Sequence, residues 1–290
     1  MAYLLNEYTV ISPLIKWAGG KRQLIPVLNK HLPGEWDTYY EPFIGGAALL
    51  VHLQNEGRIT KAVISDLNGE LINLYRVVKN RPECLVGALA NERLENNERV
   101  FSKLKAEFND IIGKKGNCTE RAALLIYLNK HGYNGLWRMN KKGMFNVPFG
   151  HHAKLSLPSV LSVMAFSRML ENVTIMNVDF GKAVRSAKKG DFVYFDPPYQ
   201  PVSKTARFTD YNPKGFTFTD QIRLSRVFRN LTKKGVRVML SNSKTEEIEE
   251  LYEDFTIHTT SAKRFINCDG NRRTGTEEII VTNYESESRR

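Results

Sequence analysis

Residues 191–199 (DFVYFDPPY) hold the side chains from which we expect chemistry. The apolar and aromatic run before Asp196 predicts a buried strand, and Pro197 and Pro198 end it because proline cannot continue a hydrogen-bonded ladder. Asp196 is therefore expected at the carboxyl end of a central strand, where open α/β sheets bind ligands. The prolines donate no N–H, so this acceptor-only corner suits a substrate amino group, and Tyr199 can stack on a planar base. The same pattern also fits an ordinary strand end with a Pro-Pro turn.

The segment WAGGK at residues 17–21 places two glycines between an aromatic residue and a lysine. Paired glycines let the backbone come close to a ligand, and Lys21 can pair with a carboxylate or a phosphate. The helix expected over residues 23–31 points its N-terminus at the same place, which favours an anion. Taken alone, the segment more often indicates a plain glycine turn before a helix.

Residues 39–49 (YYEPFIGGAAL) predict a strand, a glycine loop and a helix, as in the first βα turn of a nucleotide-binding half. The loop lacks the GxGxxG pattern, so a dinucleotide pyrophosphate site is not indicated. A second strand over residues 61–68 carries Asp66 about 20 residues after the glycine turn, where a carboxylate commonly holds ribose hydroxyls. Asp66 can also cap the helix expected over residues 69–79, and the two roles are compatible.

The chain has 290 residues, a formal net charge of +11 and an isoelectric point near 9.5. This length suits one large domain or one domain with an insert. The charge favours a polyanionic partner, with nucleic acid before an anionic membrane surface, although merely basic soluble proteins are common. No apolar run approaches a membrane span and no signal-peptide pattern opens the chain, so we expect no membrane partner.

The three cysteines form neither a metal-ligand spacing nor a disulfide framework, so a reducing cytosol is the simplest location. The six histidines show no HExxH or paired-ligand spacing, and the acidic residues form no EF-hand. We therefore expect a cytoplasmic protein without a metal site.

Residues 71–149 show successive helical faces with no strand between them, which predicts an all-helical insert in the α/β domain. The insert closes with NKHGYNGLWRMNKKGMFNVPFG at residues 129–150, whose glycines suggest turns and a hairpin. Interleaved cations, amides and aromatic rings suit phosphates, base edges and stacked bases. Arg138 can read guanine, and Asn134 or Asn140 can read adenine or bind phosphate. A solvated loop is the alternative, and the net charge favours nucleic acid.

The rest of the chain completes the sheet. A strand over residues 173–180 ends in Asp179-Phe180, an acid and a ring that can hydrogen-bond and stack on adenine. A polar loop over residues 200–218 is long enough for a substrate clamp. There follow a helix over 219–233 capped by Thr219 or Asp220, a strand over 236–240, a helix over 246–253, and a strand pair over 255–260 and 279–283 joined by a basic loop.

Four motifs together resemble the Dam-type, or D12 class, DNA adenine-N6 methyltransferases: WAGGK at 17–21, EPFIGGAAL at 41–49, ISDLN at 64–68 and FDPPY at 195–199. Their order is similar to that of the alpha group of amino-methyltransferases. Residues 133–150 resemble the family's recognition hairpin, and the likeness spans nearly the whole chain. One departure is Ala47, where the family often has glycine or serine. Alanine is small enough that we expect cofactor binding to survive.

The resemblance implies an α/β fold with a Rossmann-like, S-adenosylmethionine-dependent methyltransferase sheet. The catalytic domain is expected over residues 1–70 and 160–290, and a helical target-recognition domain over 71–159, with its hairpin near 130–150. The implied activity is site-specific methylation of adenine N6 by a monomer, on a base flipped out of double-stranded DNA. The hairpin resembles those of GATC readers. A cognate restriction endonuclease is a partner compatible with the family.

The resemblance also implies roles for individual residues. Lys21 is expected at the carboxylate of the cofactor, Asp66 at its ribose, and Asp179 with Phe180 at its adenine. The full cofactor set is Trp17, Ala18, Gly19, Gly20, Lys21, Phe43, Gly45, Gly46, Ala47, Asp66, Leu67, Asn68, Asp179, Phe180 and Asp196. The catalytic set is Asp196, Pro197, Pro198 and Tyr199, and the DNA-binding set is Tyr133, Asn134, Leu136, Arg138, Asn140 and Pro148.

Three alternatives stay open. A cytosine-N4 or RNA amino-methyltransferase would use the same corner, but the hairpin argues against it. A catalytically silent DNA-binding relative would keep the fold, but Lys21, Asp66 and Asp196 are all present. A nicotinamide oxidoreductase is least favoured, because GxGxxG is absent and DPPY has no role in hydride transfer.

Overall fold

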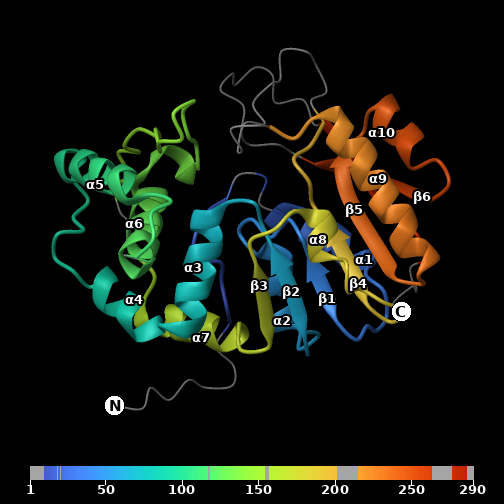
Figure 1. Ribbon diagram of the computed structural model, residues 1–290, viewed down its shortest axis with the longest axis horizontal. Coiled ribbons are helices and arrows are strands. Elements are labelled where there is room, and N and C mark those ends of the chain that lie inside the picture. Colours follow the sequence, from blue (N-terminus) through green and yellow to red (C-terminus); the bar gives the residue numbers. More distant parts are fainter. Residues whose placement is uncertain are drawn as a thin grey trace.

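The computed structural model describes residues 10–17, 19, 21–116, 118–153, 157–200, 215–262 and 276–285. Its centre is a mixed sheet with strand order β3-β2-β1-β4-β5-β7-β6 (Figure 1). Neighbouring strands from β3 to β5 are parallel, and β7 runs antiparallel between β5 and β6. The strands are β1 Tyr39–Glu41, β2 Ala62–Ser65, β3 Val173–Met176, β4 Phe192–Phe195, β5 Arg237–Ser243, β6 Thr256–Ala262 and β7 Thr276–Thr282. The predicted α/β class with a Rossmann-like sheet is confirmed.

The strand order reverses between β1 and β4. Strand β1 pairs with β2 on one side and with β4 on the other, all parallel. In a doubly wound sheet the connections leave such neighbouring strands in opposite directions, and ligands bind in the crevice outside their carboxyl ends. The glycine loop directly follows β1, and Asp196 directly follows β4. The fold therefore brings the two predicted motifs to this one point.

Helices flank the sheet and extend beyond its β3 edge (Figure 1). They are α1 Ile25–Lys30, α2 Ala48–Asn55, α3 Gly69–Asn80, α4 Pro82–Leu89, α5 Glu98–Ile111, α6 Cys118–His131, α7 Val160–Met169, α8 Phe180–Ala183, α9 Phe218–Lys233 and α10 Glu246–Leu251. Two 3-10 turns, Lys21–Gln23 and Tyr133–Gly135, precede α1 and follow α6.

Adjacent residues of the central strands pack on opposite faces of the sheet. Tyr39 and Phe192 belong to a core that includes α2, α3 and α7 and continues into the helices of the insert. Their neighbours Tyr40 and Val193 belong to a second core with α8, α9 and α10. Burial on both faces is typical of parallel strands, and it holds the carboxyl ends of β1 and β4 rigidly beside each other.

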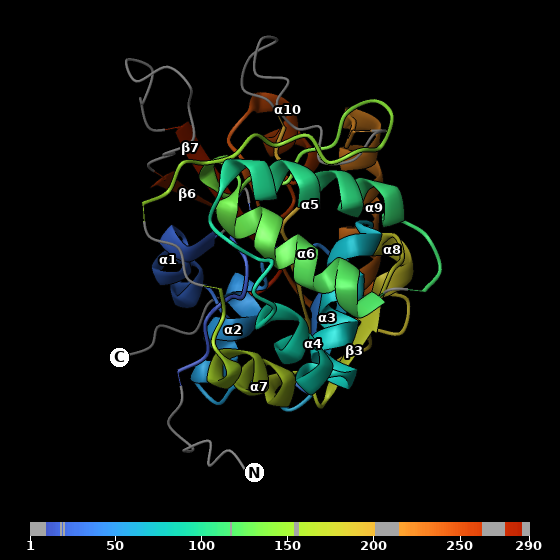
Figure 2. The same cartoon turned by 90° about the vertical axis from the view of Figure 1, so that its left-hand side faces the viewer.

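The helices α4, α5 and α6 pack together beside α3 (Figure 1), and Figure 2 shows α5 lying across α6. Helix α6 is buried at every position from 122 to 129, so it forms the centre of this helical unit. Within the described residues no strand lies between β2 and β3, as predicted. The exceptions to helix and loop are two isolated antiparallel bridges, Gly132 with Phe149 and Met139 with Phe145.

Several predicted element boundaries are wrong, among them those of the strands expected over 61–68, 236–240 and 279–283, and side-chain caps explain two others. Strand β3 ends at Met176 rather than at residue 180, because Asp179 caps α8 by accepting a hydrogen bond from the Gly181 N–H at 2.9 Å. Helix α9 is capped by Thr217 rather than by Thr219 or Asp220. Thr217 and Asp220 bond each other's backbone N–H groups reciprocally, as in a capping box. Most of the predicted clamp loop (201–214) and of the basic loop (263–275) lies outside the described residues.

Candidate active site

Asp196 leaves the end of β4 and meets side chains from two distant segments. The Lys21 ammonium lies 2.8 Å from Asp196 Oδ1, and the Ser241 hydroxyl donates to the same oxygen at 3.0 Å. The Tyr194 hydroxyl lies 2.8 Å from Ser241 Oγ, so a chain of buried hydroxyls backs the carboxylate. The side chains of Asp196 and Lys21 are 18% and 11% exposed, respectively, so both are largely buried.

Tyr199 forms the aromatic wall of this corner. The Lys21 ammonium lies 4.0 Å from the centroid of the Tyr199 ring, in cation–π geometry. The Tyr199 hydroxyl donates to Glu278 Oε2 on β7 at 3.1 Å. Lys21 thus joins the WAGGK segment to both Asp196 and Tyr199, two contacts that the sequence did not predict.

Burial and neighbouring charges together set the pKa values of Asp196 and Lys21. Burial raises the pKa of the Asp196 carboxyl, while the charge and hydrogen bond of Lys21 act against that rise. Burial alone would lower the pKa of Lys21, but the acidic groups around it outweigh burial and the pKa of the ammonium is raised. Lys21 is therefore protonated at neutral pH, and its charge favours the ionised form of Asp196.

A buried amide network holds the backbone after Asp196. Gln221 on α9 donates to the Pro198 carbonyl at 3.1 Å and accepts from the Asn242 amide at 3.1 Å. Asn242 on β5 in turn accepts from the Gln200 N–H at 3.2 Å. Gln221 and Asn242 are almost wholly buried, so the turn after β4 is anchored on two other elements.

The glycine loop and Asp66 face each other across the ends of β1 and β2. Asp66 Oδ2 accepts from the Gly45 N–H at 3.3 Å, and its Oδ1 accepts from the Asn68 N–H at 2.8 Å. The Tyr75 hydroxyl donates to the Gly45 carbonyl at 2.6 Å. Burial raises the pKa of Asp66 to about 6, against the effect of these backbone hydrogen bonds.

The glycines of this loop are required by contact with Trp17. A Cβ on Gly45 would lie 2.9 Å from the indole, and one on Gly46 would lie 3.1 Å from Trp17 Cβ. Ala47 adopts φ +60°, in the left-handed region that favours glycine. The residue that departs from the family pattern is therefore also the strained one.

Asp179 and Phe180 are brought beside Phe43, whose ring stacks on Phe180 with centroids 5.4 Å apart. Arg223 on α9 covers both residues. Its guanidinium donates to the two Asp179 oxygens at 2.7 and 2.6 Å and lies 3.9 Å from the Phe180 ring centroid. Sequence reasoning missed Arg223, whose only local signal is its place on a polar helix face.

The remaining predicted cofactor residues have mixed environments. Asn68, rather than Asp66, caps α3, because its side chain accepts from the N–H groups of Glu70 and Leu71. Leu67 is 55% exposed. Gly19 has φ +76° and open space around it, while Ala18 and Gly20 lie outside the described residues.

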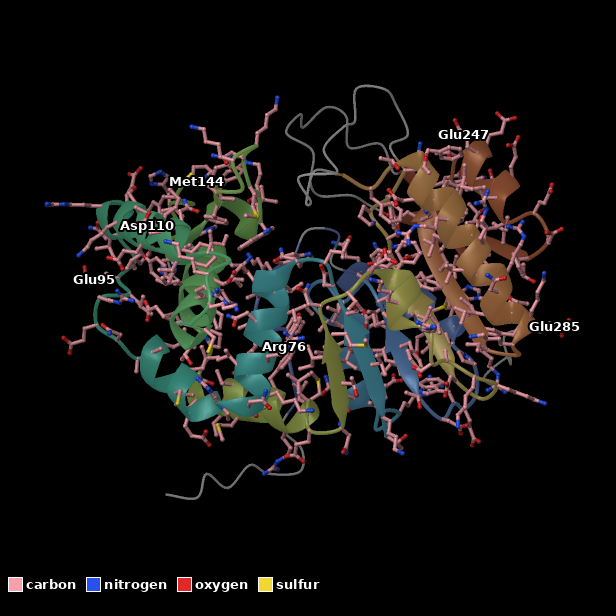
Figure 3. All side chains as sticks on the ribbon, viewed as in Figure 1. Arg76, Glu95, Asp110, Met144, Glu247 and Glu285 are labelled. Carbon is pink, nitrogen blue, oxygen red and sulfur yellow. The ribbon has the colours of Figure 1, made fainter. Side chains whose placement is uncertain are left out.

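The predicted hairpin is present and is hydrogen-bonded across its two arms. The Tyr133 N–H donates to the Pro148 carbonyl at 2.9 Å, and the Asn146 N–H donates to the Arg138 carbonyl at 3.0 Å. Asn140 forms the turn by accepting from the N–H groups of residues 142 and 144. The exposed side chain of Met144 marks this turn beside α5 (Figure 3).

The hairpin separates its buried and exposed side chains. Trp137, Phe145 and Val147 are buried against the helices. The predicted DNA-binding residues lie on the other side: Tyr133, Asn134, Arg138 and Pro148 are exposed, and Leu136 and Asn140 are partly exposed. The Arg138 guanidinium donates to the side-chain and backbone oxygens of Asn146 at 2.9 and 3.0 Å, which fixes its position on the hairpin.

Two asparagines that sequence reasoning missed fasten the hairpin. Asn109 on α5 accepts from the Phe145 N–H at 2.7 Å and donates to its carbonyl at 3.0 Å. Asn129 on α6 pairs in the same way with Lys16, at 2.8 and 2.7 Å, and also donates to the Gly135 carbonyl at 2.8 Å. Trp17 stacks on Trp137 with centroids 5.9 Å apart. The WAGGK segment and the hairpin are thus one packed unit.

In the part of the chain that the structure describes, no three His, Cys, Asp or Glu side chains are grouped to hold a metal ion. No helix there is long and apolar enough to cross a membrane.

The sequence profile of the family described as "D12 class N6 adenine-specific DNA methyltransferase" matches residues 17–266, which include all four motifs and the hairpin. The chain belongs to this D12 class. It is 44% identical to the Type II methyltransferase M1.LlaDCHI of Lactococcus lactis subsp. cremoris, over 94% of this chain and 96% of the relative. It is 39% identical to the Type II methyltransferase M.MjaIII of Methanocaldococcus jannaschii, over 94% and 99%. It is 33% identical to the DNA adenine methylase of Escherichia coli K12, over 92% and 93%.

The resemblance to D12 class methyltransferases is confirmed. This D12 methyltransferase is an enzyme that methylates the N6 position of adenine in DNA, and S-adenosylmethionine is its methyl donor.

Proposed function

We propose that this D12 methyltransferase methylates the N6 amino group of an adenine rotated out of double-stranded DNA, within the sequence GATC. The observation that carries the chemistry is the corner formed by Asp196 and Tyr199 at the carboxyl end of β4, beside the reversal of strand order. A carboxylate beside an aromatic wall matches a base that carries an amino group.

The residues around β1 and β2 fit S-adenosylmethionine. Each Asp66 oxygen accepts one backbone N–H and keeps a lone pair for a ribose hydroxyl. We place Asp66 at the ribose, the loop of Gly45 and Gly46 beneath the cofactor, and Phe43 and Phe180 at its adenine. The other predicted contacts belong to the same proposal: Trp17, Ala18, Gly19, Gly20, Lys21, Ala47, Leu67, Asn68 and Asp179. The cofactor supplies a methyl group already activated by its sulfonium.

The protein residues act mainly on the amino group. The amino nitrogen of adenine is a weak nucleophile because its lone pair is delocalised into the ring. Hydrogen bonds to Asp196 and to the Pro197 carbonyl favour a pyramidal nitrogen with a localised lone pair. The Asp196 charge also stabilises the positive charge that develops on this nitrogen. Orientation and electrostatics, rather than strong base catalysis, are the contribution of the corner.

Tyr199 helps to hold the base outside the duplex. Rotating a base out of the stack costs roughly a few kcal/mol. Stacking on an aromatic side chain returns about 1–3 kcal/mol, so Tyr199 offsets much of that cost. Lys21 lies on this ring and on Asp196, so its proposed contact with the cofactor carboxylate requires the ammonium to serve both sites or to move.

The helical segment 71–159 is proposed as the target-recognition domain, joined to a catalytic domain of residues 1–70 and 160–290. Its exposed hairpin residues are Tyr133, Asn134, Leu136, Arg138, Asn140 and Pro148, and the net charge of +11 favours DNA. The GATC assignment rests on the resemblance of the hairpin to those of GATC readers. The names of two relatives also support a restriction-modification role with a cognate endonuclease. We propose a monomer in the cytoplasm.

Methyl transfer from labelled S-adenosylmethionine tests this function. The substrates are duplexes that carry GATC or a scrambled site, and the proteins are wild type, Asp196→Ala and the isosteric Asp196→Asn. We expect label only in the GATC adenine and at least about a hundredfold loss in both variants, since preorganised electrostatic groups contribute on that scale. Equal labelling of both duplexes would discard GATC while keeping the methyltransferase.

Product analysis separates the alternatives. Label in N4-methylcytosine or in RNA would move the proposal to the related amino-methyltransferases. Binding to duplex DNA with no cofactor binding and no transfer to any sequence would instead support a catalytically silent DNA-binding relative.

A further inference from the structure

Glu278 is a buried acid on β7 that none of the sequence motifs includes. It is 6% exposed, and it pairs across the sheet with Ser243, two residues after the Ser241 that bonds Asp196. Alternation along β7 puts Glu278 on the same face as Ile280, which belongs to the core of Tyr194. The neighbouring Glu277 points to the other face, where it is exposed and pairs with Lys244 at 3.1 Å.

Glu278 reaches the corner through Tyr199. The Tyr199 hydroxyl donates to Glu278 Oε2 at 3.1 Å, while the ammonium of Lys21 lies 4.0 Å from the ring centroid. One bond at the tip and one cation on the face together restrict rotation of the ring about its side-chain torsions. A bond from a hydroxyl to a buried carboxylate is among the stronger kinds of hydrogen bond.

We propose that Glu278 is a positioning residue for methyl transfer: its carboxylate holds the Tyr199 hydroxyl and so sets the ring against which the target base stacks. The inference rests on the proposed function, because it gives the Tyr199 ring the role of a platform for the base. It explains why β7, which pairs with the strand that carries Ser241, supplies a buried acid to this corner.

Four variants test it. Glu278→Ala removes the acceptor, and Glu278→Gln keeps an acceptor oxygen without the charge. Tyr199→Phe removes the hydroxyl and leaves the ring. Glu277→Gln is the matched control, since it alters the adjacent acid on the opposite face. Each protein is assayed for kcat, for KM of S-adenosylmethionine, for thermal unfolding, and for fluorescence of a 2-aminopurine placed at the target adenine of the duplex.

We expect Glu278→Ala and Tyr199→Phe each to lower kcat about tenfold, the scale of one hydrogen bond to a charged group. KM for the cofactor should stay unchanged. The loss of kcat in the double variant should be smaller than the product of the two single losses, because both single variants remove one shared bond. Glu278→Gln should keep most of the activity. In Glu278→Ala the bound 2-aminopurine should be brighter than in wild type, since a base that stacks less is quenched less.

The inference is overturned if folded Glu278→Ala matches Glu277→Gln in kcat, if the double variant is additive, or if Glu278→Gln falls as far as Glu278→Ala. If Glu278→Ala does not fold, the test depends on Tyr199→Phe and Glu278→Gln. A wild-type kcat in Tyr199→Phe then overturns the inference. Failure of the proposed function looks different, because the wild-type protein would then transfer no methyl group to any duplex.

Discussion

The Lys21 ammonium lies 2.8 Å from Asp196 Oδ1, and both side chains are largely buried. The two residues come from the motifs WAGGK and DPPY, which stand far apart in the sequence. Lys21 and Ser241 both bind Oδ1, so this carboxylate oxygen is engaged within the protein. The pair sets the charge state of Asp196 as well as its orientation.

Replacing Lys21 by methionine should shift the pH dependence of methyl transfer. Burial raises the pKa of Asp196 and the positive charge of Lys21 lowers it, so loss of that charge raises this pKa further. Because transfer uses the ionised form of Asp196 in the proposed mechanism, the acidic limb of the kcat profile should move to higher pH. The control is Lys30→Met, on the exposed side of α1. An unshifted acidic limb in Lys21→Met would contradict the assigned role of the pair.

Cofactor affinity should depend on the ionisation of Asp66. Burial raises the pKa of this carboxyl to about 6, above its ordinary value. The ionised form is therefore present above about pH 6 and is lost as the pH falls through that value. We expect S-adenosylmethionine binding in equilibrium dialysis to weaken below pH 6 in wild type, and to be weaker but independent of pH in Asp66→Asn. If Asp66→Asn binds S-adenosylmethionine as tightly as wild type at pH 8, Asp66 is not part of the cofactor site.

Replacing Asn129 and replacing Asn109, the two asparagines that fasten the hairpin, should have different effects on ligand binding. Asn129→Ala unpairs the N–H and carbonyl of Lys16 and the buried Gly135 carbonyl, at about 1–3 kcal/mol for a buried group left unsatisfied, and should lower stability and affinity for both cofactor and DNA. Asn109→Ala releases Phe145 alone, so it should reduce DNA affinity and leave cofactor affinity unchanged. Denaturant unfolding and separate binding titrations measure these effects. Equal loss of cofactor affinity in the two variants would argue against a selective link through Asn129.

Alanine variants of Arg138 and Lys142 should distinguish sequence-specific DNA recognition from general electrostatic attraction to DNA. Arg138→Ala should reduce discrimination between GATC and a scrambled duplex by about 1–3 kcal/mol, the scale of one bidentate contact to guanine. Lys142 is exposed, and Lys142→Ala should weaken binding to both duplexes equally. The salt dependence of affinity should then correspond to roughly one fewer released counterion. Binding isotherms at several salt concentrations distinguish the two. If Arg138→Ala weakens binding to both duplexes equally, Arg138 contacts a phosphate rather than a base.

Local sequence was enough for most of the fold and for the place of the chemistry. The apolar run before Asp196 and the two prolines after it determine a buried strand that stops at an acid, whatever the rest of the chain does. Asp66 and the glycine loop follow from the same reasoning, and so does the hairpin after α6. The wrong boundaries at β3 and α9 came from side-chain caps, in which Asp179 and Thr217 bond the backbone of their own turn.

Tertiary structure alone decided which of these residues touch. Lys21 on Asp196, Arg223 on Asp179 and Tyr199 on Glu278 join segments that no local periodicity relates. Periodicity reports which face of an element is buried, but it carries no information about which distant polar group will satisfy a buried charge. That choice is made when the sheet assembles, because an ionised or hydrogen-bonding group that loses water must find its partner on whatever element packs against it.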